Sequence, residues 1–133
     1  IEEIYLIDKY DSKVQEINES YDVFKIGDIV FVKDYFYKDG KKGKDHLFVI
    51  IDKEKTSIKI ENFAMLISSK VEKLRYKSNI LLEKNSENNL NKNSIVKTDI
   101  LYKINNNQIS YRVGHVTSND INRFKKIFLE NFL

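Results

Sequence analysis

The hydrophobic and polar positions of this chain predict a helical start, a middle made of short strands and a helical end. Residues 1–22 contain neither glycine nor proline. Within them, apolar side chains spaced by four, three and four residues form one helical stripe, at Tyr10, Val14, Ile17 and Tyr21. We therefore expect an amphipathic N-terminal helix, which either covers its own domain or docks against a partner.

The middle of the chain consists of short runs rich in β-branched and aromatic residues, which indicate strands. The expected strands are residues 29–35, 47–51, 63–68, 79–82, 94–97, 99–104 and 108–113. The run 47–51 is apolar without a break, so we expect a central strand there. The stretches 37–45 and 83–93 are polar and are expected to be loops. Three asparagines at 105–107 predict a hairpin turn, because Asn tolerates positive φ.

The last segment has the clearest helical pattern. Thr117 or Ser118 can cap its first turn, and Asp120 complements the helix dipole. The apolar face consists of Ile121, Phe124, Phe128 and Phe132. Short strands with terminal helices predict a mainly β (α+β) fold, and a small SH3-like β-barrel is favoured over a sandwich. We assign residues 1–25 to an N-terminal helical extension and residues 26–133 to the barrel domain.

Composition argues against several classes of protein. The chain has no cysteine, so disulfides and cysteine-based zinc sites are excluded, which fits the reducing cytoplasm. No stretch approaches the about 20 apolar residues that a membrane span needs, and no secretion signal is recognisable. The spacing of Gly40 and Gly43 matches neither a P-loop nor a dinucleotide fingerprint. We therefore expect a cytoplasmic protein with no membrane span, no metal and no cofactor.

The net charge is only +3, but the basic residues are clustered. One cluster lies in the predicted loop 37–45 and consists of Lys38, Lys41, Lys42 and Lys44. A second follows the predicted strand 63–68 and consists of Lys70, Lys73, Arg75 and Lys77. Such clusters can hold a phosphate backbone, although lysine-rich loops often serve solubility alone.

Five segments, in order, resemble the MazF/PemK family of toxins. Residues 27–32 (Gly-Asp-Ile-Val-Phe-Val) look like the family's opening strand, and residues 44–51 stand where the family has Arg-Pro before an apolar strand. Residues 63–70 are similar to its strand ending in Pro-Ile-Thr-Ser, and residues 93–100 to its strand ending in Asp-Gln-Ile. Residues 113–118 are similar to the segment that begins its last helix. The resemblance begins at residue 26 and continues to the end of the chain.

The resemblance implies a metal-independent endoribonuclease that cuts single-stranded RNA such as mRNA and leaves a 2′,3′-cyclic phosphate and a 5′-hydroxyl. It also implies a homodimer that forms the RNA groove and an antitoxin protein that blocks it. The family's catalytic Arg and Thr correspond to His46 and Ser68 here. An imidazole titrates near neutral pH and can act as base or acid, and the Ser68 hydroxyl can donate to a phosphate oxygen.

The candidate RNA-binding residues are Tyr37, Lys44, Ser69, Lys70, Arg75 and Asp99. The lysines would hold phosphates, and an exposed tyrosine can stack on an unpaired base. Structural roles compete with these: a histidine or serine at a strand end often only packs or caps, and His115 is expected to donate to backbone. Two other functions stay open. One is a non-catalytic RNA- or peptide-binding barrel, and the other is a structural protein that binds a partner through its N-terminal helix.

Overall fold

The computed structural model describes residues 23–33, 35–37, 39–56 and 59–131. The predicted helix over residues 1–22 lies outside the described residues, so the N-terminal extension stays a prediction. Within the described part, no helix is both long and apolar enough to cross a membrane.

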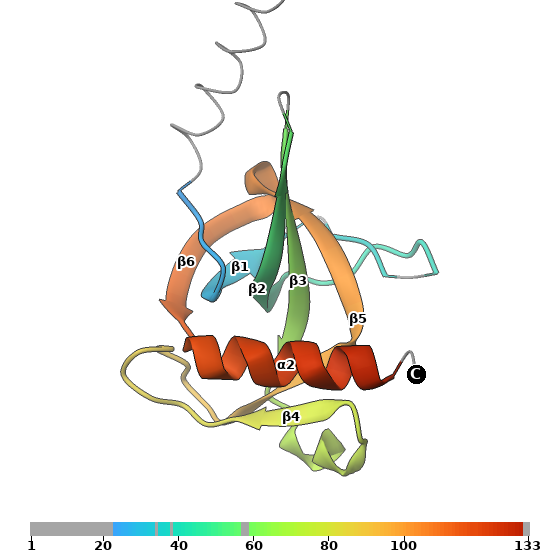
Figure 1. Cartoon of the computed structure of the whole chain (residues 1–133), viewed down its shortest axis with the longest axis vertical. Coiled ribbons are helices and arrows are strands. Elements are labelled where there is room, and N and C mark those ends of the chain that lie inside the picture. The colour runs from blue at the N-terminus through green and yellow to red at the C-terminus, as the bar shows by residue number, and fades with distance from the viewer. Residues whose placement is uncertain (1–22, 34, 38, 57–58, 132–133) are drawn as a thin grey trace, which may run out of the picture.

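The described residues form one antiparallel sheet of six strands. The strands are β1 (Asp28–Val32), β2 (His46–Lys55), β3 (Ile60–Ser68), β4 (Asn79–Leu82), β5 (Ser94–Asn105) and β6 (Ile109–His115). Their hydrogen-bonded order is β4-β5-β3-β2-β1-β6, which leaves β4 and β6 as the two edges of an open sheet. Figure 1 shows the sheet strongly curved, with β5 and β6 arching to either side of the three central strands. The predicted mainly β class is confirmed.

A single α-helix in the described part, α2 (Ser118–Glu130), lies across the curved sheet (Figure 1). Two short 3-10 helices, η1 (Val71–Arg75) and η2 (Asn106–Gln108), join strands. The predicted cap is confirmed at Thr117, whose hydroxyl accepts a hydrogen bond from the backbone N–H of Asp120 at 3.1 Å. Ile121 and Phe124 are buried as predicted, while Phe132 lies outside the described residues.

The turn between β5 and β6 differs from the prediction. None of the asparagines 105–107 has positive φ, so that part of the prediction is wrong. The turn is instead the 3-10 helix η2, in which the Gln108 side chain accepts a hydrogen bond from the backbone N–H of Asn105 at 2.7 Å. A side-chain cap thus replaces the left-handed residues that a tight hairpin needs.

Residues that alternate along the central strands supply two hydrophobic clusters, because successive side chains of a strand point to opposite faces. The first cluster includes Ile29, Val49, Met65, Ile67 and Phe124, and therefore lies between the sheet and α2. The second cluster includes Val32, Tyr35, Phe48, Ile50 and Leu66. Burial on both faces explains why residues 47–51 are apolar without interruption.

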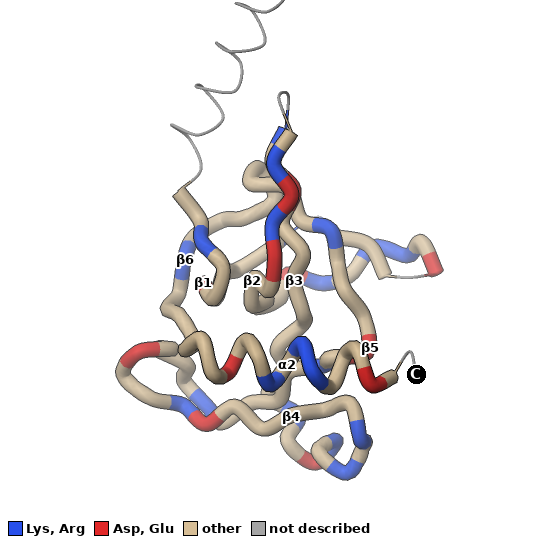
Figure 2. The backbone as a smooth tube through the Cα atoms, viewed as in Figure 1, with Lys and Arg blue, Asp and Glu red and all other residues tan. Residues whose placement is uncertain are grey.

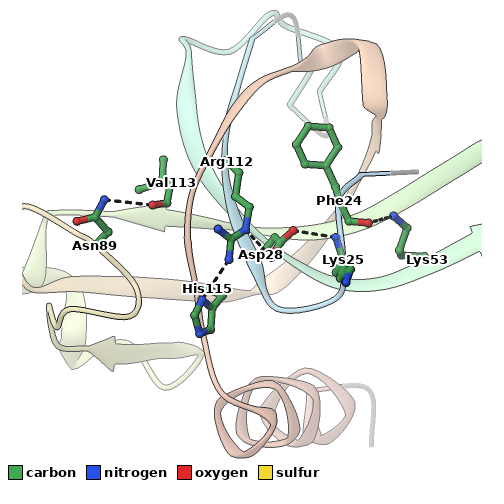
Figure 3. Close-up of polar contacts among 8 residues, drawn as sticks. All are labelled: Phe24, Lys25, Asp28, Lys53, Asn89, Arg112, Val113 and His115. Carbon is green, nitrogen blue, oxygen red and sulfur yellow. Dashed lines mark hydrogen bonds and ion pairs between the residues drawn. The ribbon is translucent and has the colours of Figure 1, made fainter. Parts of the chain in front are cut away.

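The Gly27-Asp28 pair at the start of β1 has a structural role, and Figure 3 shows the contacts of Asp28. Gly27 has a φ of 95°, which only glycine adopts readily. The nearly buried Asp28 carboxylate accepts hydrogen bonds from the backbone N–H of Lys25 at 2.8 Å and from Nε of Arg112 at 2.9 Å. Nη2 of Arg112 lies 3.1 Å from Nδ1 of His115, so the His115 ring contacts this guanidinium rather than backbone. The pair therefore ties β1 to β6.

We expect the substitution Asp28→Asn to lower the free energy of unfolding by about 1–3 kcal/mol, because it removes a buried charge partner of Arg112. Urea denaturation followed by circular dichroism measures the loss. Asp52→Asn is the matched control, because Asp52 is exposed and its contact with Lys125 is 3.9 Å long. That change should cost less than about 0.5 kcal/mol. Equal losses in the two variants would contradict the structural role of Asp28.

Candidate active site

The two predicted catalytic residues lie at the same end of neighbouring strands. β2 begins at His46 and β3 ends at Ser68. The two strands are antiparallel, and their ladder pairs Leu47 with Ile67, the residues next to the candidate pair. Both side chains line the same two hollows, which meet at this end of the two strands. The structure thus brings His46 and Ser68 together.

The first of the two hollows, which we name the Tyr37 hollow, has a volume of about 400 Å³. Its lining includes His46, Ser68, Lys70, Tyr37, Lys73, Lys97, Asp99 and Tyr102. Three lysines in one concave site give it a positive potential that suits a phosphodiester. Figure 2 shows that basic residues also gather on the coil that follows β3, where η1 lies.

The second hollow, which we name the Phe31 hollow, has a volume of about 410 Å³. Its lining includes His46, Ser68, Lys70, Phe31, Leu47, Ile67, Ser69, Leu90, Asn91 and Lys92. His46, Ser68 and Lys70 are therefore common to both hollows. A strand of RNA that passed from one hollow to the other would cross these three residues.

His46 has a backbone partner for either state of its Nδ1 atom. Nδ1 accepts a hydrogen bond from the backbone N–H of Leu47 at 3.0 Å and lies 3.3 Å from the carbonyl oxygen of the same residue. The N–H favours the tautomer that carries its hydrogen on Nε2, and the carbonyl favours the tautomer that carries it on Nδ1. Nε2 can therefore act as donor or as acceptor, which general acid–base chemistry requires.

Burial lowers the pKa of the half-buried His46 below its ordinary value of 6.5, and the ammonium groups of Lys97 and Lys70 lower it further. A hydrogen bond with the Leu47 backbone acts in the opposite direction. The net lowering keeps the imidazole neutral at pH 7, so its lone pair is available to take a proton.

The Ser68 hydroxyl is oriented by the chain that follows it. Its oxygen accepts a hydrogen bond from the backbone N–H of Lys70 at 3.2 Å, while the side chain is largely buried at the end of β3. With the oxygen engaged as an acceptor, the hydroxyl hydrogen can be donated to a ligand. A buried donor in a site lined by lysines is suited to a developing negative charge.

An aromatic cluster supports the Tyr37 hollow. The Phe48 ring contacts Tyr35 and Tyr102 edge-on, with centroid distances of 4.9 and 5.2 Å, and lies 6.4 Å from the His46 ring. Tyr37 packs edge-on against Tyr35 at 5.6 Å. Burial, together with the nearby Asp99 and Tyr37, raises the pKa of Tyr102, so its phenol stays protonated at neutral pH. The cluster fixes the ring that neighbours the imidazole.

A large bulge in β5 carries Asp99 to the hollow. In the β3–β5 ladder, Leu66 pairs with Lys97 and Ala64 pairs with Tyr102, so residues 98–101 of β5 face only Met65. The predicted break between strands 94–97 and 99–104 corresponds to this bulge within one continuous strand. Bulges re-aim side chains and are common next to active sites.

The other predicted RNA-binding residues divide into two groups. Tyr37, Lys70 and Asp99 line the Tyr37 hollow, and Ser69 lines the Phe31 hollow. The structure does not bring Lys44 or Arg75 to either hollow. Lys44 is exposed in the loop before β2, and Arg75 lies over the ring of Tyr76, with 5.1 Å between its guanidinium carbon and the ring centroid.

Sequence reasoning missed Lys97 and Tyr102 as residues of the site. Lys97 is half-buried within β5, between the buried Val96 and Thr98. A lysine that directly follows the apolar pair Ile95-Val96 is a signal of function that the sequence contained, since lysine is rarely buried without a partner. Tyr102 carries no such signal, because aromatic residues are ordinary in strands.

The part of the chain that the structure describes contains no group of three or more His, Cys, Asp or Glu side chains that could hold a metal ion. The lining of the Tyr37 hollow includes one imidazole, three lysines, a serine hydroxyl, one carboxylate and two tyrosine rings.

A family model for PemK-like, MazF-like toxins of type II toxin–antitoxin systems matches residues 25–132. The chain belongs to this family. Its members are endoribonucleases that act on RNA and are paired with an antitoxin, and the predicted resemblance is confirmed.

The fold of this MazF-like toxin is also found among solved structures. The Mycobacterium tuberculosis toxin MazF-mt6 is similar, with a TM-score of 0.57 and 15% sequence identity over 79% of this chain and 95% of that one. At that identity the likeness concerns the fold alone. A search of curated protein sequences gave no match.

Proposed function

We propose that this toxin is a metal-independent endoribonuclease that cuts single-stranded RNA such as mRNA. The observation that carries the proposal is the position of His46, Ser68 and Lys70 on the wall common to two hollows. An RNA strand laid across that wall brings one phosphodiester to the three side chains. The neighbouring nucleotides then occupy the hollows on either side.

In the proposed reaction His46 takes the proton of the 2′-hydroxyl as that oxygen bonds to phosphorus. The P–O5′ bond breaks, and the leaving O5′ takes a proton from the imidazolium. The products are a 2′,3′-cyclic phosphate and a 5′-hydroxyl, and no water or metal enters the balance. The lowered pKa of His46 favours the neutral base at the start of the cycle.

Ser68 and the lysines supply charge stabilisation in this proposal. The Ser68 hydroxyl donates to a non-bridging oxygen as the phosphorane forms. Lys70 and Lys97 lie close enough to His46 to lower its pKa, so they also lie close enough to attract the phosphate. Tyr37, Ser69 and Asp99 contact the flanking nucleotides, and Lys44 and Arg75 hold phosphates farther along the strand.

The wider setting is proposed on the family resemblance. The toxin works in the cytoplasm as a homodimer of small SH3-like barrels, and an antitoxin protein neutralises it by covering the groove. Residues 1–25 precede the barrel domain, which comprises residues 26–133. The strong curvature of the sheet supports the barrel (Figure 1).

Incubating the protein with a long unstructured RNA in excess EDTA tests the function. We expect discrete cuts whose 5′ ends accept a phosphate from polynucleotide kinase without prior dephosphorylation. Ser68→Ala should slow cutting by about 100- to 1,000-fold, the effect of losing one donor to a transition-state oxyanion. Ser86→Ala is the matched control, because Ser86 is exposed in the loop 83–93 and should be neutral. RNA bound but left intact by the parent protein would favour the non-catalytic binding barrel instead.

A further inference from the structure

The Phe31 hollow has the construction of a site for one nucleobase. Its inner wall is apolar, formed in part by Phe31, Leu47 and Leu90, and its exposed rim is polar, formed in part by Asp45, Asn91 and Lys92. Its volume of about 410 Å³ falls within the range of small-molecule sites, about 300–1,000 Å³. An apolar wall with a few polar groups at the rim binds a flat heterocycle by stacking and orients it by hydrogen bonds.

The Phe31 ring is held in a fixed orientation. In the sheet, the residue Phe31 pairs with Leu47 of β2 on one side and with Tyr111 of β6 on the other. The Tyr111 ring stacks on Phe31 with a centroid distance of 5.3 Å and an interplanar angle of 15°. Tyr111 is itself 55% exposed, so this aromatic pair reaches from the hollow to the surface. A ring that is already ordered loses little entropy when a base stacks on it.

The polar rim is held in place as well, because hydrogen bonds within the loop 83–93 and between this loop and β6 fix its conformation. The buried Asn88 side chain donates to the carbonyl oxygen of Glu83 at 2.8 Å and accepts from the backbone N–H of Leu90 at 3.1 Å. The backbone N–H of His115 donates to the carbonyl oxygen of Glu87 at 3.1 Å, which ties the loop to β6.

The contact between this loop and β6 requires Gly114. A Cβ atom at that position would lie 2.4 Å from the carbonyl oxygen of Asn88, too close for any side chain. Asn89, whose side chain donates to the carbonyl oxygen of Val113 at 3.2 Å, adds a second tie (Figure 3). Asn91 and Lys92 come two and three residues after Asn89, so the docked loop places them at the rim.

From this geometry we infer that the Phe31 hollow is a base-specific subsite. One of the two nucleotides that flank the cut bond inserts its base against Phe31, Asn91 reads the edge of that base, and Lys92 holds an adjacent phosphate. The inference rests on the proposed ribonuclease function. Continuity with His46 and Ser68, and the lysines on the wall and rim, favour RNA as the occupant over a peptide side chain.

The test compares three variants on the RNA sites that the parent protein cuts. Phe31→Leu removes the aromatic ring on which the base stacks. Asn91→Ala removes the amide that hydrogen-bonds to the edge of the base and leaves the hydrophobic core unchanged. Phe36→Leu is the control, because Phe36 is 60% exposed and lines neither hollow. We expect Phe31→Leu to raise KM by about 5- to 150-fold with kcat nearly unchanged. Sequencing the cut ends should show relaxed base choice at one position next to the cut in both hollow variants, and at none in the control.

A binding experiment separates this inference from the proposed function. The probe is a set of short 2′-fluoro RNAs that lack the attacking hydroxyl and cannot be cut, each with 2-aminopurine at a different position, so that no cut site has to be known. If the parent protein quenches this probe and Phe31→Leu does not, the subsite stands, even if the parent cuts no RNA. Unchanged base choice and equal quenching in Phe31→Leu and Asn91→Ala overturn the subsite, even if the parent is an active ribonuclease.

Discussion

His46→Gln should reduce the rate constant of RNA cutting by about 100- to 10,000-fold while changing RNA affinity only a few-fold. General acid–base groups contribute about that factor. Glutamine keeps the approximate size of the imidazole and a hydrogen-bonding end, but it cannot exchange a proton near pH 7. Single-turnover cutting at saturating RNA measures the rate constant, and filter binding of uncleavable RNA measures the affinity.

His46→Gln should also abolish the fall of kcat/KM with pH that the parent protein shows on the acid side. Because burial and two lysines hold the pKa of His46 below 6.5, the neutral base is lost as the pH falls through that lowered pKa. The parent's kcat/KM should therefore decline about tenfold per unit on the acid side and be level near pH 7. Lys97→Gln removes one of the causes of the lowering, so its acid limb should move to higher pH.

His115→Gln is the control for both measurements. His115 is the other histidine of the chain, it is exposed, and it contacts Arg112 rather than either hollow. It should leave the rate constant and the pH profile unchanged. A parent profile that instead falls on the alkaline side through a group lost in His46→Gln would make His46 the acid of the first step and not the base. Identical profiles for both histidine variants would remove His46 from the mechanism.

Some parts of the site could be predicted from the sequence because they depend on local order. Gly27-Asp28 precedes a β-branched run, and the apolar run from Leu47 must be a strand buried on both faces. His46 and Ser68 stand next to such runs, so the family resemblance was enough to select them. Their position on the wall common to the two hollows follows once the strands on which they lie are antiparallel neighbours.

Other parts could not be predicted because they depend on contacts between distant segments. Lys97 reaches the site only because β5 pairs with β3 across an intervening segment that holds η1 and β4. Asp99 reaches it through a bulge whose length no local pattern encodes. Asn91 reaches the Phe31 hollow because Gly114 admits a distant loop. Hydrophobic periodicity describes which face a residue occupies, whereas these three positions depend on register and on the docking of one backbone against another.

Phe48→Ala should lower the free energy of unfolding by about 3–5 kcal/mol, the usual cost of truncating a fully buried phenylalanine. Phe124→Ala, in α2, should cost about the same, because Phe124 is also fully buried, in the first hydrophobic cluster. Urea denaturation should place both variants in the same range. A loss below about 1.5 kcal/mol for Phe48→Ala would mean that the second cluster collapses into the space that the ring leaves.

The substitutions Phe48→Leu and Phe124→Leu test site geometry apart from stability. Leucine keeps most of the apolar volume of phenylalanine, so both variants stay folded. Phe48 contacts the rings of Tyr35 and Tyr102 and lies next to His46, whereas Phe124 packs between the sheet and the helix. Phe48→Leu should therefore slow RNA cutting at least tenfold at a temperature where both proteins are folded, and Phe124→Leu should not. Equal activity in the two leucine variants would show that the aromatic cluster supports the fold but does not position the imidazole.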